Sequence, residues 1–409
     1  MVKILYVTHM PPDLSGSTLS LSYLVAYLDR QHYDPVLVFS ERGEAANNFE
    51  SLQAPMIYLK LAKYIHNASE ILTPIRLRSW LLMFLSFFPD PRLASIARQY
   101  HIDLVHLNAS VLMSAAITFH RIKLPIVWHV REVIPHGWFG IRRMLLTRAI
   151  TKYADAIICI SEDEAAPFAG NAKLHVIYNP VDLQRFEPAH TNPQGIRKEF
   201  DLADDVVVIG FVASVAHHKG IWDLVEAAER VVAVASRPVK FMIVGAGKPS
   251  HRYPTGWRVR LQNRLGFYVD GLQELNAVLK SKGLTQHFIL TGERTDTPDL
   301  IATMDIVTFP SRLNAIGRIA IEAGALGKPV IATDQEGRTG LIRNGQTGLL
   351  VPPEDPERLA SALLHLIEHP DEARRLGQNA REHAQRNFDA TYHTQRVMQI
   401  YASLSQERS

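Results

Sequence analysis

The chain has 409 residues, too many for one hydrophobic core of ordinary size, so two domains are expected. With 47% hydrophobic and 21% charged residues, the composition is that of a globular protein and excludes a disordered one. The formal net charge is only +3, but the stretch from Lys60 to Lys152 holds 13 basic and 4 acidic residues, which indicates an anionic partner.

The chain has one cysteine, Cys159, inside the apolar run AIICI. A single cysteine excludes an internal disulfide and a thiolate metal cluster, and it fits a reducing compartment. The first residues, MVKILYVTHMPP, have the pattern of a strand and not of a signal peptide. The longest apolar stretch, Trp80 to Phe88, is half of the roughly 18 residues that a membrane span needs. These features predict a cytoplasmic protein.

The chain opens with a predicted buried strand, Lys3 to Thr8, followed by a loop and a helix from Leu19 to Leu28. The loop contains Gly16 and Ser17, whose hydroxyl can hydrogen-bond a phosphate or an acceptor. A lone glycine is weak evidence for a phosphate loop, so by itself this segment favours a structural role.

Further strands are predicted at residues 35–39, 102–107, 125–128 and 156–160, with helical patterns between them. Strands that alternate with helices predict a parallel, doubly wound sheet, whose ligands bind at the carboxyl ends of the strands. Polar side chains follow the strands there: His106 with Asn108; His129, Arg131 and Glu132; and Ser161 with Glu162. A histidine at a strand end can also be purely structural.

Residues 186–200, with Pro188, Pro193 and Gly195, are the predicted linker. A second domain then opens with the strand 206–212, the loop Ser214 to Gly220 and a helix to about residue 235. The strand 240–244 ends in Gly-Ala-Gly, which lacks the third glycine of a dinucleotide-binding loop. The basic and aromatic segment 248–268 is expected to be an active-site flap or a solvated loop, more than a site for single-stranded nucleic acid.

The most informative stretch runs from Pro310 to Thr333. A strand (305–309) leads into a loop, Gly317 stands at a predicted helix start, and Gly327 and Pro329 end that helix before a last strand. A helix entered from such a loop presents free N–H groups and the positive end of its dipole, which suit a diphosphate. Glu322 lies inside the helix and Asn314 eight residues before it.

This stretch resembles the donor-site motif of the retaining glycosyltransferases of family 4, enzymes with the GT-B fold. Gly317, Glu322 and the run 327–331 match the motif, and Asn314 stands where the family has its first glutamate. An ordinary strand–helix–strand unit with a surface glutamate is the alternative. The resemblance extends to Lys219, which matches a phosphate-binding lysine, while Ser214 occupies the position of the family's arginine.

The resemblance implies an α/β protein of two Rossmann-like, doubly wound domains facing across a cleft. Residues 1–187 would bind the acceptor and be completed by a C-terminal helix, 388–409, that crosses back. Residues 188–387 would bind a nucleotide-diphosphate sugar. The segment His129 to Glu132 resembles the family segment whose histidine lies beside the donor sugar and acceptor.

The resemblance also assigns roles. Glu322 would hold the donor ribose, Asn314 would contact the sugar, and Lys219 would bind the diphosphate, helped by protonated His217 or His218. Main-chain amides of Ala315, Ile316 and Gly317 would complete the donor site, with Ser214, and with Gly16 and Ser17 from the other domain. His129, Lys219 and Asn314 are the predicted catalytic residues, and Arg131, Glu132 and His106 the predicted acceptor residues.

The predicted activity is retaining transfer of a sugar to a saccharide or a lipid-linked saccharide in polysaccharide or glycoconjugate biosynthesis, with no cofactor, no obligatory metal and no nucleic-acid partner. Two segments, 71–88 and 138–146, mix arginines with aromatic and aliphatic residues, which favours peripheral binding to an anionic membrane at its inner face. Alone, residues 80–88 predict a buried core helix.

Two other functions fit the sequence. One is a nucleotide-sugar epimerase of the same fold, with Glu132 and Asp13 as acid and base. The other is a catalytically silent nucleotide-sugar binding protein, indicated by Ser214 and Asn314.

Overall fold

The computed structural model describes residues 1–9, 16–43, 49–61, 84–132, 134, 140–247, 271–312, 317–334 and 340–406. The chain forms two compact units, and each is described by itself. Unit 1 comprises Met1–Pro180 and Asp389–Ser409, and unit 2 comprises Val181–Phe388. Unit 1 thus ends at Pro180, seven residues before the predicted domain end at residue 187. Val181, the first residue of unit 2, donates its N–H to the carbonyl of Phe388, the last residue of that unit, at 2.7 Å.

The linker predicted at 186–200 is wrong. Glu187 pairs with Arg381 at 2.8 Å, and helix α8 (Pro193–Glu199) belongs to unit 2. Asn192 caps α8 by accepting from the N–H of Gly195, and Pro193 takes the first helical position. The proline and glycine that indicated a linker are therefore helix-start signals.

Unit 1 contains a seven-stranded, fully parallel sheet in the order β3-β2-β1-β4-β5-β6-β7, as the alternating pattern predicted. The strands are β1 (Val2–Val7), β2 (Tyr33–Phe39), β3 (Met56–Tyr58), β4 (Leu104–Leu107), β5 (Ile126–Val130), β6 (Ala156–Cys159) and β7 (Leu174–Val176). The described helices are α1 (Gly16–Ala26), α4 (Pro91–Gln99), α5 (Met113–Arg121), α6 (Ile141–Tyr153), α7 (Glu162–Ala165) and α16 (Ala390–Gln406).

Apolar residues fill both faces of this sheet. One core cluster joins the sheet to α4, α5 and α6, and it includes Trp128, Phe119 and Leu146. The other joins it to α1 and to the C-terminal helix α16, which inserts Val397 and Tyr401. The predicted return of the last helix to the N-terminal domain is therefore confirmed.

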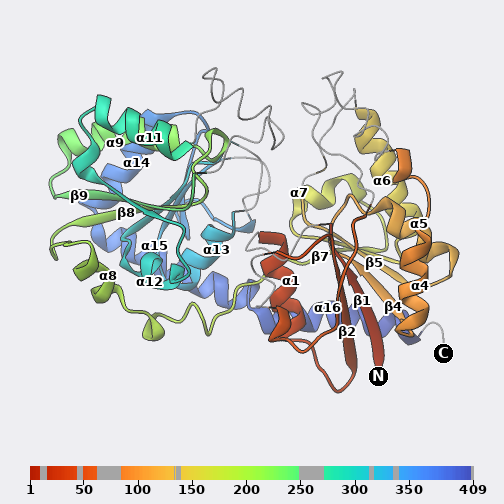
Figure 1. The fold of residues 1–409 in the computed structure, drawn as a ribbon. Coiled ribbons are helices and arrows are strands. Elements are labelled where there is room, and N and C mark those ends of the chain that lie inside the picture. Colours follow the sequence, from red (N-terminus) through yellow and green to blue (C-terminus); the bar gives the residue numbers. More distant parts are fainter. Residues whose placement is uncertain are drawn as a thin grey trace. The chain divides into compact units, whose positions relative to one another are not determined.

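Unit 2 contains a six-stranded parallel sheet in the order β10-β9-β8-β11-β12-β13. The strands are β8 (Val207–Val212), β9 (Val239–Val244), β10 (Phe288–Gly292), β11 (Ile306–Phe309), β12 (Val330–Thr333) and β13 (Gly348–Val351). The other helices are α9 (Ile221–Val234), α11 (Gly271–Ser281), α12 (Thr297–Thr303), α13 (Arg318–Ala325), α14 (Pro356–Glu368) and α15 (Pro370–Asn387). Figure 1 shows α9, α11 and α14 on one face of this sheet and α8 and α12 on the other.

The strand orders fix where ligands can bind. In unit 2 the strands β8 and β11 are neighbours, although β9 and β10 lie between them in the chain. In unit 1 the strands β1 and β4 are related in the same way. Connections leave such a pair in opposite directions, which opens a crevice at the carboxyl ends of the strands. The loops after β1, β4, β8 and β11 therefore form the ligand edges.

Helix α13, which carries Glu322, is held by close packing of two glycines. A Cβ atom on Gly377 of α15 would lie 2.0 Å from the carbonyl oxygen of Gly327, just after α13. Alanine ordinarily stabilises a helix by about 1 kcal/mol over glycine, but an overlap this severe with a backbone oxygen costs about 2–3 kcal/mol, at the upper end of the usual range for overpacking. We expect Gly377→Ala to destabilise the protein by roughly 1–2 kcal/mol.

Calorimetric unfolding measures this effect. Gln378→Ala, at the exposed neighbouring position, is the control and should change stability by less than about 0.5 kcal/mol. A Gly377→Ala protein as stable as the control would contradict the close packing of α13 on α15.

Candidate active site

In unit 2, the loop after β8 leads through the short helix His217–Lys219 to Gly220, which has a φ of +76°. A Cβ atom on Gly220 would lie 1.8 Å from the carbonyl oxygen of Pro310, so this position requires glycine. Ser214 is half-buried in the same loop, against Gly245 at the end of β9. His217 is directed to Glu274 of α11, with 3.3 Å between Nε2 and Oε1.

The loop after β11 is tied to this first loop. The carbonyl oxygen of His218 accepts from the N–H of Arg312 at 3.0 Å and from the hydroxyl of Ser311 at 3.3 Å. Thr333, at the end of β12, donates to the carbonyl of Ser311 at 2.6 Å. The two predicted donor motifs, far apart in the sequence, are therefore joined at the β8/β11 edge of the sheet.

A partly buried ion pair reinforces this junction. Arg312 donates to both carboxylate oxygens of Asp223 in the first turn of α9, at 3.0 and 2.5 Å. The Asp223 side chain is 7% exposed and that of Arg312 33%. Sequence reasoning missed this pair, because nothing in the spacing of residues 223 and 312 marks them as neighbours.

Helix α13 begins at Arg318, and Gly317 before it is the N-cap residue, which has no side chain to cap the helix. A Cβ atom on Gly317 would lie 2.4 Å from the ring of Phe309, so glycine brings this turn close to the end of β11. Glu322 is 8% exposed, and its Oε1 accepts from Nε of Arg318 at 3.1 Å. The predicted residues Asn314, Ala315 and Ile316 lie outside the described residues, as do Asp13 and the segment 248–268.

In unit 1, the predicted polar residues meet at the carboxyl ends of β4 and β5. His106 and His129 are fully buried, with 3.2 Å between Nε2 of His106 and Nδ1 of His129. The other nitrogen of His106 lies 2.6 Å from the hydroxyl oxygen of Tyr401 on α16. Burial, with a smaller effect of the Arg131 charge, lowers the pKa of both imidazoles well below the ordinary value. Both histidines are therefore neutral at physiological pH.

Arg131 lies beside them and is itself buried. It donates to the side-chain oxygens of Asn108, at 2.6 Å, and Asn179, at 2.8 Å. Asn108 reaches the carbonyl of Ser17 at 3.4 Å, which connects Arg131 to the start of α1. Gly16 and Ser17, predicted in a loop, instead lie in the first turn of α1. Asn179 was missed because it lies after β7, away from the strand ends that were considered.

Glu132 is held by the N-terminal side of α5. Its Oε1 accepts from the N–H and the hydroxyl of Ser110, at 3.0 and 2.6 Å. The structure thus brings His106, His129 and Arg131 together and places Glu132 next to them in the chain. Ser161 and Glu162 instead stand at the start of α7, where the Ser161 hydroxyl accepts from the N–H of Asp163 as an N-cap and donates to the carboxylate of Glu164.

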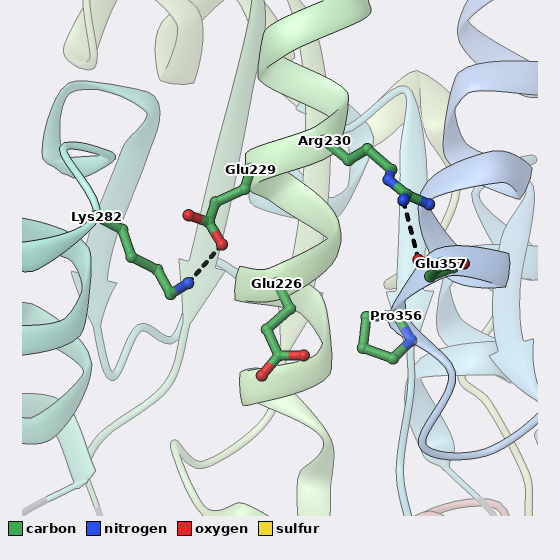
Figure 2. Close-up of a pocket in the computed structure, with 6 residues that line it drawn as sticks. All are labelled: Glu226, Glu229, Arg230, Lys282, Pro356 and Glu357. Atoms are coloured by element: carbon green, nitrogen blue, oxygen red, sulfur yellow. Dashed lines mark hydrogen bonds and ion pairs between the residues drawn. The ribbon is translucent and has the colours of Figure 1, made fainter.

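A different hollow lies on unit 2, between α9, α11 and α14 (Figure 2). Its volume is about 570 Å³, and it is open to solvent. Its walls carry two ion pairs, Lys282 with Glu229 and Arg230 with Glu357, while the Glu226 carboxylate lies between them. None of the predicted site residues lines it.

The described residues provide neither a metal-binding group nor a helix that could span a membrane. Among the described residues, no three His, Cys, Asp or Glu side chains are grouped so that they could hold a metal ion. No helix in the same part of the chain is long and apolar enough to cross a membrane.

Sequence comparison identifies the family. Residues 194–383 match the model of the glycosyl transferases group 1, and residues 14–185 match that of glycosyltransferase family 4. The chain belongs to the family 4 glycosyltransferases, which have the GT-B fold.

Among individual relatives, the chain is 28% identical to a D-inositol 3-phosphate glycosyltransferase of Kribbella flavida over 252 residues, which are 59% of this chain and 55% of the relative. It thus spans about half the length of that relative. It is 26% identical to the lipopolysaccharide core biosynthesis mannosyltransferase LpsB of Rhizobium meliloti, over 73% of this chain and 79% of LpsB.

Solved structures share the fold. The crystal structure of Anabaena Alr3699/HepE in complex with UDP and glucose matches with a TM-score of 0.76 and 22% identity, over 98% of this chain and 100% of that one. WaaG, a glycosyltransferase involved in lipopolysaccharide biosynthesis, matches with a TM-score of 0.66 and 12% identity, over 97% and 99%.

The Asp223–Arg312 pair can be tested by Asp223→Asn, which removes the charge and keeps one acceptor oxygen. Hydrogen bonds to charged groups contribute about 1.5–3 kcal/mol, and partial exposure of Arg312 reduces this, so we expect a loss of roughly 1–2 kcal/mol in calorimetric unfolding. The matched control is Glu357→Gln, which breaks the exposed pair of Figure 2 and should cost less than about 0.5 kcal/mol. Equal losses would contradict a special role for the Asp223 pair.

Proposed function

We propose that this protein is a retaining glycosyltransferase that takes a sugar from a nucleoside-diphosphate donor bound by unit 2. The observation that carries the proposal is the junction of the Lys219 loop with the start of α13. Hydrogen bonds between His218, Ser311 and Arg312 join the loop that carries Lys219 to the end of β11, and Gly317 at the start of α13 packs on Phe309 of the same strand.

Both parts of that junction favour negative charge. A nucleoside diphosphate gains charge as the bond to the sugar breaks, so a cation and free N–H groups stabilise it more in the transition state than before. Lys219 supplies the cation, and the amides of Ala315, Ile316 and Gly317 supply the N–H groups. Ser214, in place of the family's arginine, offers the phosphates a hydroxyl. This arrangement supports charge stabilisation by the protein alone, so we propose that no metal and no cofactor are required.

Glu322 is proposed to bind the donor ribose. Its nearly buried carboxylate is oriented by Arg318 one turn earlier, through Oε1, and this orientation favours hydrogen bonds from the two ribose hydroxyls. Asn314, where the family has a glutamate, would face the donor sugar with an amide that both donates and accepts.

The named ligands of similar proteins support this donor class. HepE has been crystallised with UDP and glucose and with UDP-glucose. The relatives named for D-inositol 3-phosphate and for the lipopolysaccharide core support an acceptor with a sugar-like hydroxyl.

The acceptor is proposed to bind unit 1 near His129, Arg131, Glu132 and His106. Retention without a covalent intermediate requires the acceptor hydroxyl to attack from the side that the diphosphate leaves. The leaving phosphate can then take the acceptor proton, and the protein positions both groups and stabilises charge. The start of α1, with Gly16 and Ser17, would complete the site near the sugar and phosphates.

The surface of unit 1 supports a membrane-borne acceptor. Phe84 is 59% exposed, and the other exposed apolar side chains nearby in sequence or on α6 are Leu85, Phe87, Phe88, Met144 and Leu145. The expectation that residues 80–88 form a buried core helix is thus wrong for four of the residues that the structure describes. Exposed aromatic residues in a chain region with 13 basic and 4 acidic residues suit an anionic membrane surface. We propose a lipid-linked saccharide acceptor at the inner face of the cytoplasmic membrane.

Lys219→Ala tests the diphosphate assignment. Loss of one preorganised charged donor should raise the activation free energy of sugar transfer by about 2–4 kcal/mol and lower kcat accordingly. Mass spectrometry of the protein after incubation with a mixed nucleotide-sugar pool first identifies the donor that binds. The rate at which nucleoside diphosphate is released from that donor then measures kcat. Lys282→Ala, from the hollow in Figure 2, is the control. If the activity of Lys219→Ala is within twofold of the control, Lys219 does not bind the diphosphate. If the sugar of the donor is converted to another sugar when no acceptor is present, the protein is instead an epimerase.

Glu322→Ala should act mainly on donor binding, because ribose contacts change little along the reaction. Hydrogen bonds to a carboxylate contribute about 1.5–3 kcal/mol, so calorimetry should find the Kd for the donor raised about 10- to 150-fold. Glu226→Ala, on the exposed side of α9, should leave that Kd unchanged. An unaltered Kd in Glu322→Ala would show that the ribose binds elsewhere.

Membrane binding is tested by sedimentation with vesicles of anionic phospholipid at low and high salt. We expect the protein to sediment with them at low salt and less at high salt, because salt screens the basic surface. Phe84→Ser/Phe88→Ser, which removes two exposed rings, should weaken sedimentation at both salt concentrations. Protein that stays in the supernatant at low salt would favour a soluble acceptor.

A further inference from the structure

Unit 2 has a second pocket, at the amino ends of its strands. It has a volume of about 270 Å³ and lies where β8, β11 and β12 begin, beside the end of α14 and the first turn of α15. We call it the amino-end pocket. Because β8 is six residues long, the pocket lies about 20 Å along the strand direction from the loops of the proposed donor site. A ligand bound here therefore leaves the donor site empty.

Basic side chains outnumber acidic ones in the amino-end pocket. Lys328 follows α13, Arg237 precedes β9, Arg374 lies on α15, and Asp305 precedes β11. Arg374 forms an exposed ion pair with Asp371 of its own helix. Within the described part of the chain, Lys328 and Arg237 form no ion pair with a carboxylate. The pocket therefore carries an excess of positive charge.

Asp305 does not neutralise this excess, because its carboxylate has other partners. Its Oδ2 accepts from the N–H of Val208 at 2.8 Å and lies 3.7 Å from a guanidinium nitrogen of Arg197. The carboxylate thus compensates the charge of Arg197, which lies just behind the pocket. An anion from solution can still find uncompensated cations there.

Lys328 is the most unusual of these cations. It is half-buried, and its ammonium makes no hydrogen bond with the residues that the structure describes. Burial lowers the pKa of its amine, Asp305 opposes this shift, and Arg197 adds to it. The fold therefore holds a cation at a place that disfavours positive charge, and a bound anion would remove this cost.

The size and the lining of the pocket restrict the ligand. Its volume lies just below the roughly 300–1,000 Å³ of most small-molecule sites, which favours a ligand smaller than a nucleotide sugar. Lysine and arginine donate to phosphate oxygens with strong, charge-assisted hydrogen bonds. Apolar side chains suit a carbon skeleton, and they are Val207, Ile306, Pro329, Leu366 and Ile367.

We propose that the amino-end pocket binds a small phosphate monoester, such as a sugar phosphate. Lys328 and Arg237 donate to the phosphate, and the apolar lining packs on the carbon skeleton. The proposal does not depend on the proposed function, because none of the residues assigned to the donor or the acceptor lines this pocket.

Calorimetric titration of the full chain with inorganic phosphate, glycerol 3-phosphate and glucose 6-phosphate tests the site. The titrations use Lys219→Ala protein, because this change weakens any phosphate binding at the proposed donor site. We expect the esters to bind, and to bind more tightly than inorganic phosphate. Adding Lys328→Met should raise their Kd at least about tenfold, as for one charge-assisted hydrogen bond. Adding Arg237→Gln should raise it about threefold to tenfold, since this side chain is exposed.

The matched control is Lys280→Met, on the exposed side of α11 and outside the pocket. It should leave every Kd within about twofold. Thermal unfolding provides a second measurement. Lys328→Met alone should be at least as stable as the wild type without ligand, because methionine fills similar space without a buried charge. Glucose 6-phosphate should raise the Tm of the wild type and not that of Lys328→Met.

Three results would overturn the proposal. The first is that neither ester binds at millimolar concentration, and the second is that Lys328→Met leaves their Kd unchanged. The third is that inorganic phosphate binds as tightly as the esters, because the apolar lining would then contribute nothing. If the binding follows the expected pattern but the protein transfers no sugar, the proposed function fails and the amino-end pocket stands.

Discussion

The proposed donor site depends on the contact between the loops that follow β8 and β11. Gly220 lies so close to the carbonyl of Pro310 that no side chain fits, and the carbonyl of His218 accepts from both Ser311 and Arg312. The two strands are neighbours only because the sheet reverses its winding between them. The loop that carries Lys219 thus takes its position from main-chain contacts with the end of β11.

In unit 1 the main constraint is the burial of polar side chains. This unit buries Arg131 and two histidines at the end of its sheet, where an unsatisfied polar group is costly. Asn108 and Asn179 bind the guanidinium through neutral amides, and burial keeps the imidazoles uncharged. Neutral, oriented groups suit a sugar, whose hydroxyls both donate and accept, just as the cation and helix terminus of unit 2 suit a diphosphate.

Much of the fold could be predicted from the sequence, because strands such as Lys3 to Thr8 and Val206 to Val212 are continuous apolar runs between loop signals. The helix carrying Glu322 was equally clear from its spacing and from the glycines at its ends. The linker at 186–200 was misjudged because Asn192 and Pro193 serve a helix start and a linker equally well. Tyr401, Asn179 and the Asp223–Arg312 pair could not be found from local patterns, since each acts across a long separation in the chain.

The central claim is that unit 2 binds a nucleoside diphosphate between Lys219 and the start of α13. A crystal structure with a nucleoside diphosphate, grown without divalent metal, tests it most directly. The account predicts phosphate oxygens within hydrogen-bond distance of Lys219 Nζ and of main-chain N–H groups at Gly317, with the ribose hydroxyls on Glu322. A nucleotide bound instead in the hollow of Lys282 and Arg230, with Lys219 and Glu322 making no contact to it, would contradict the account.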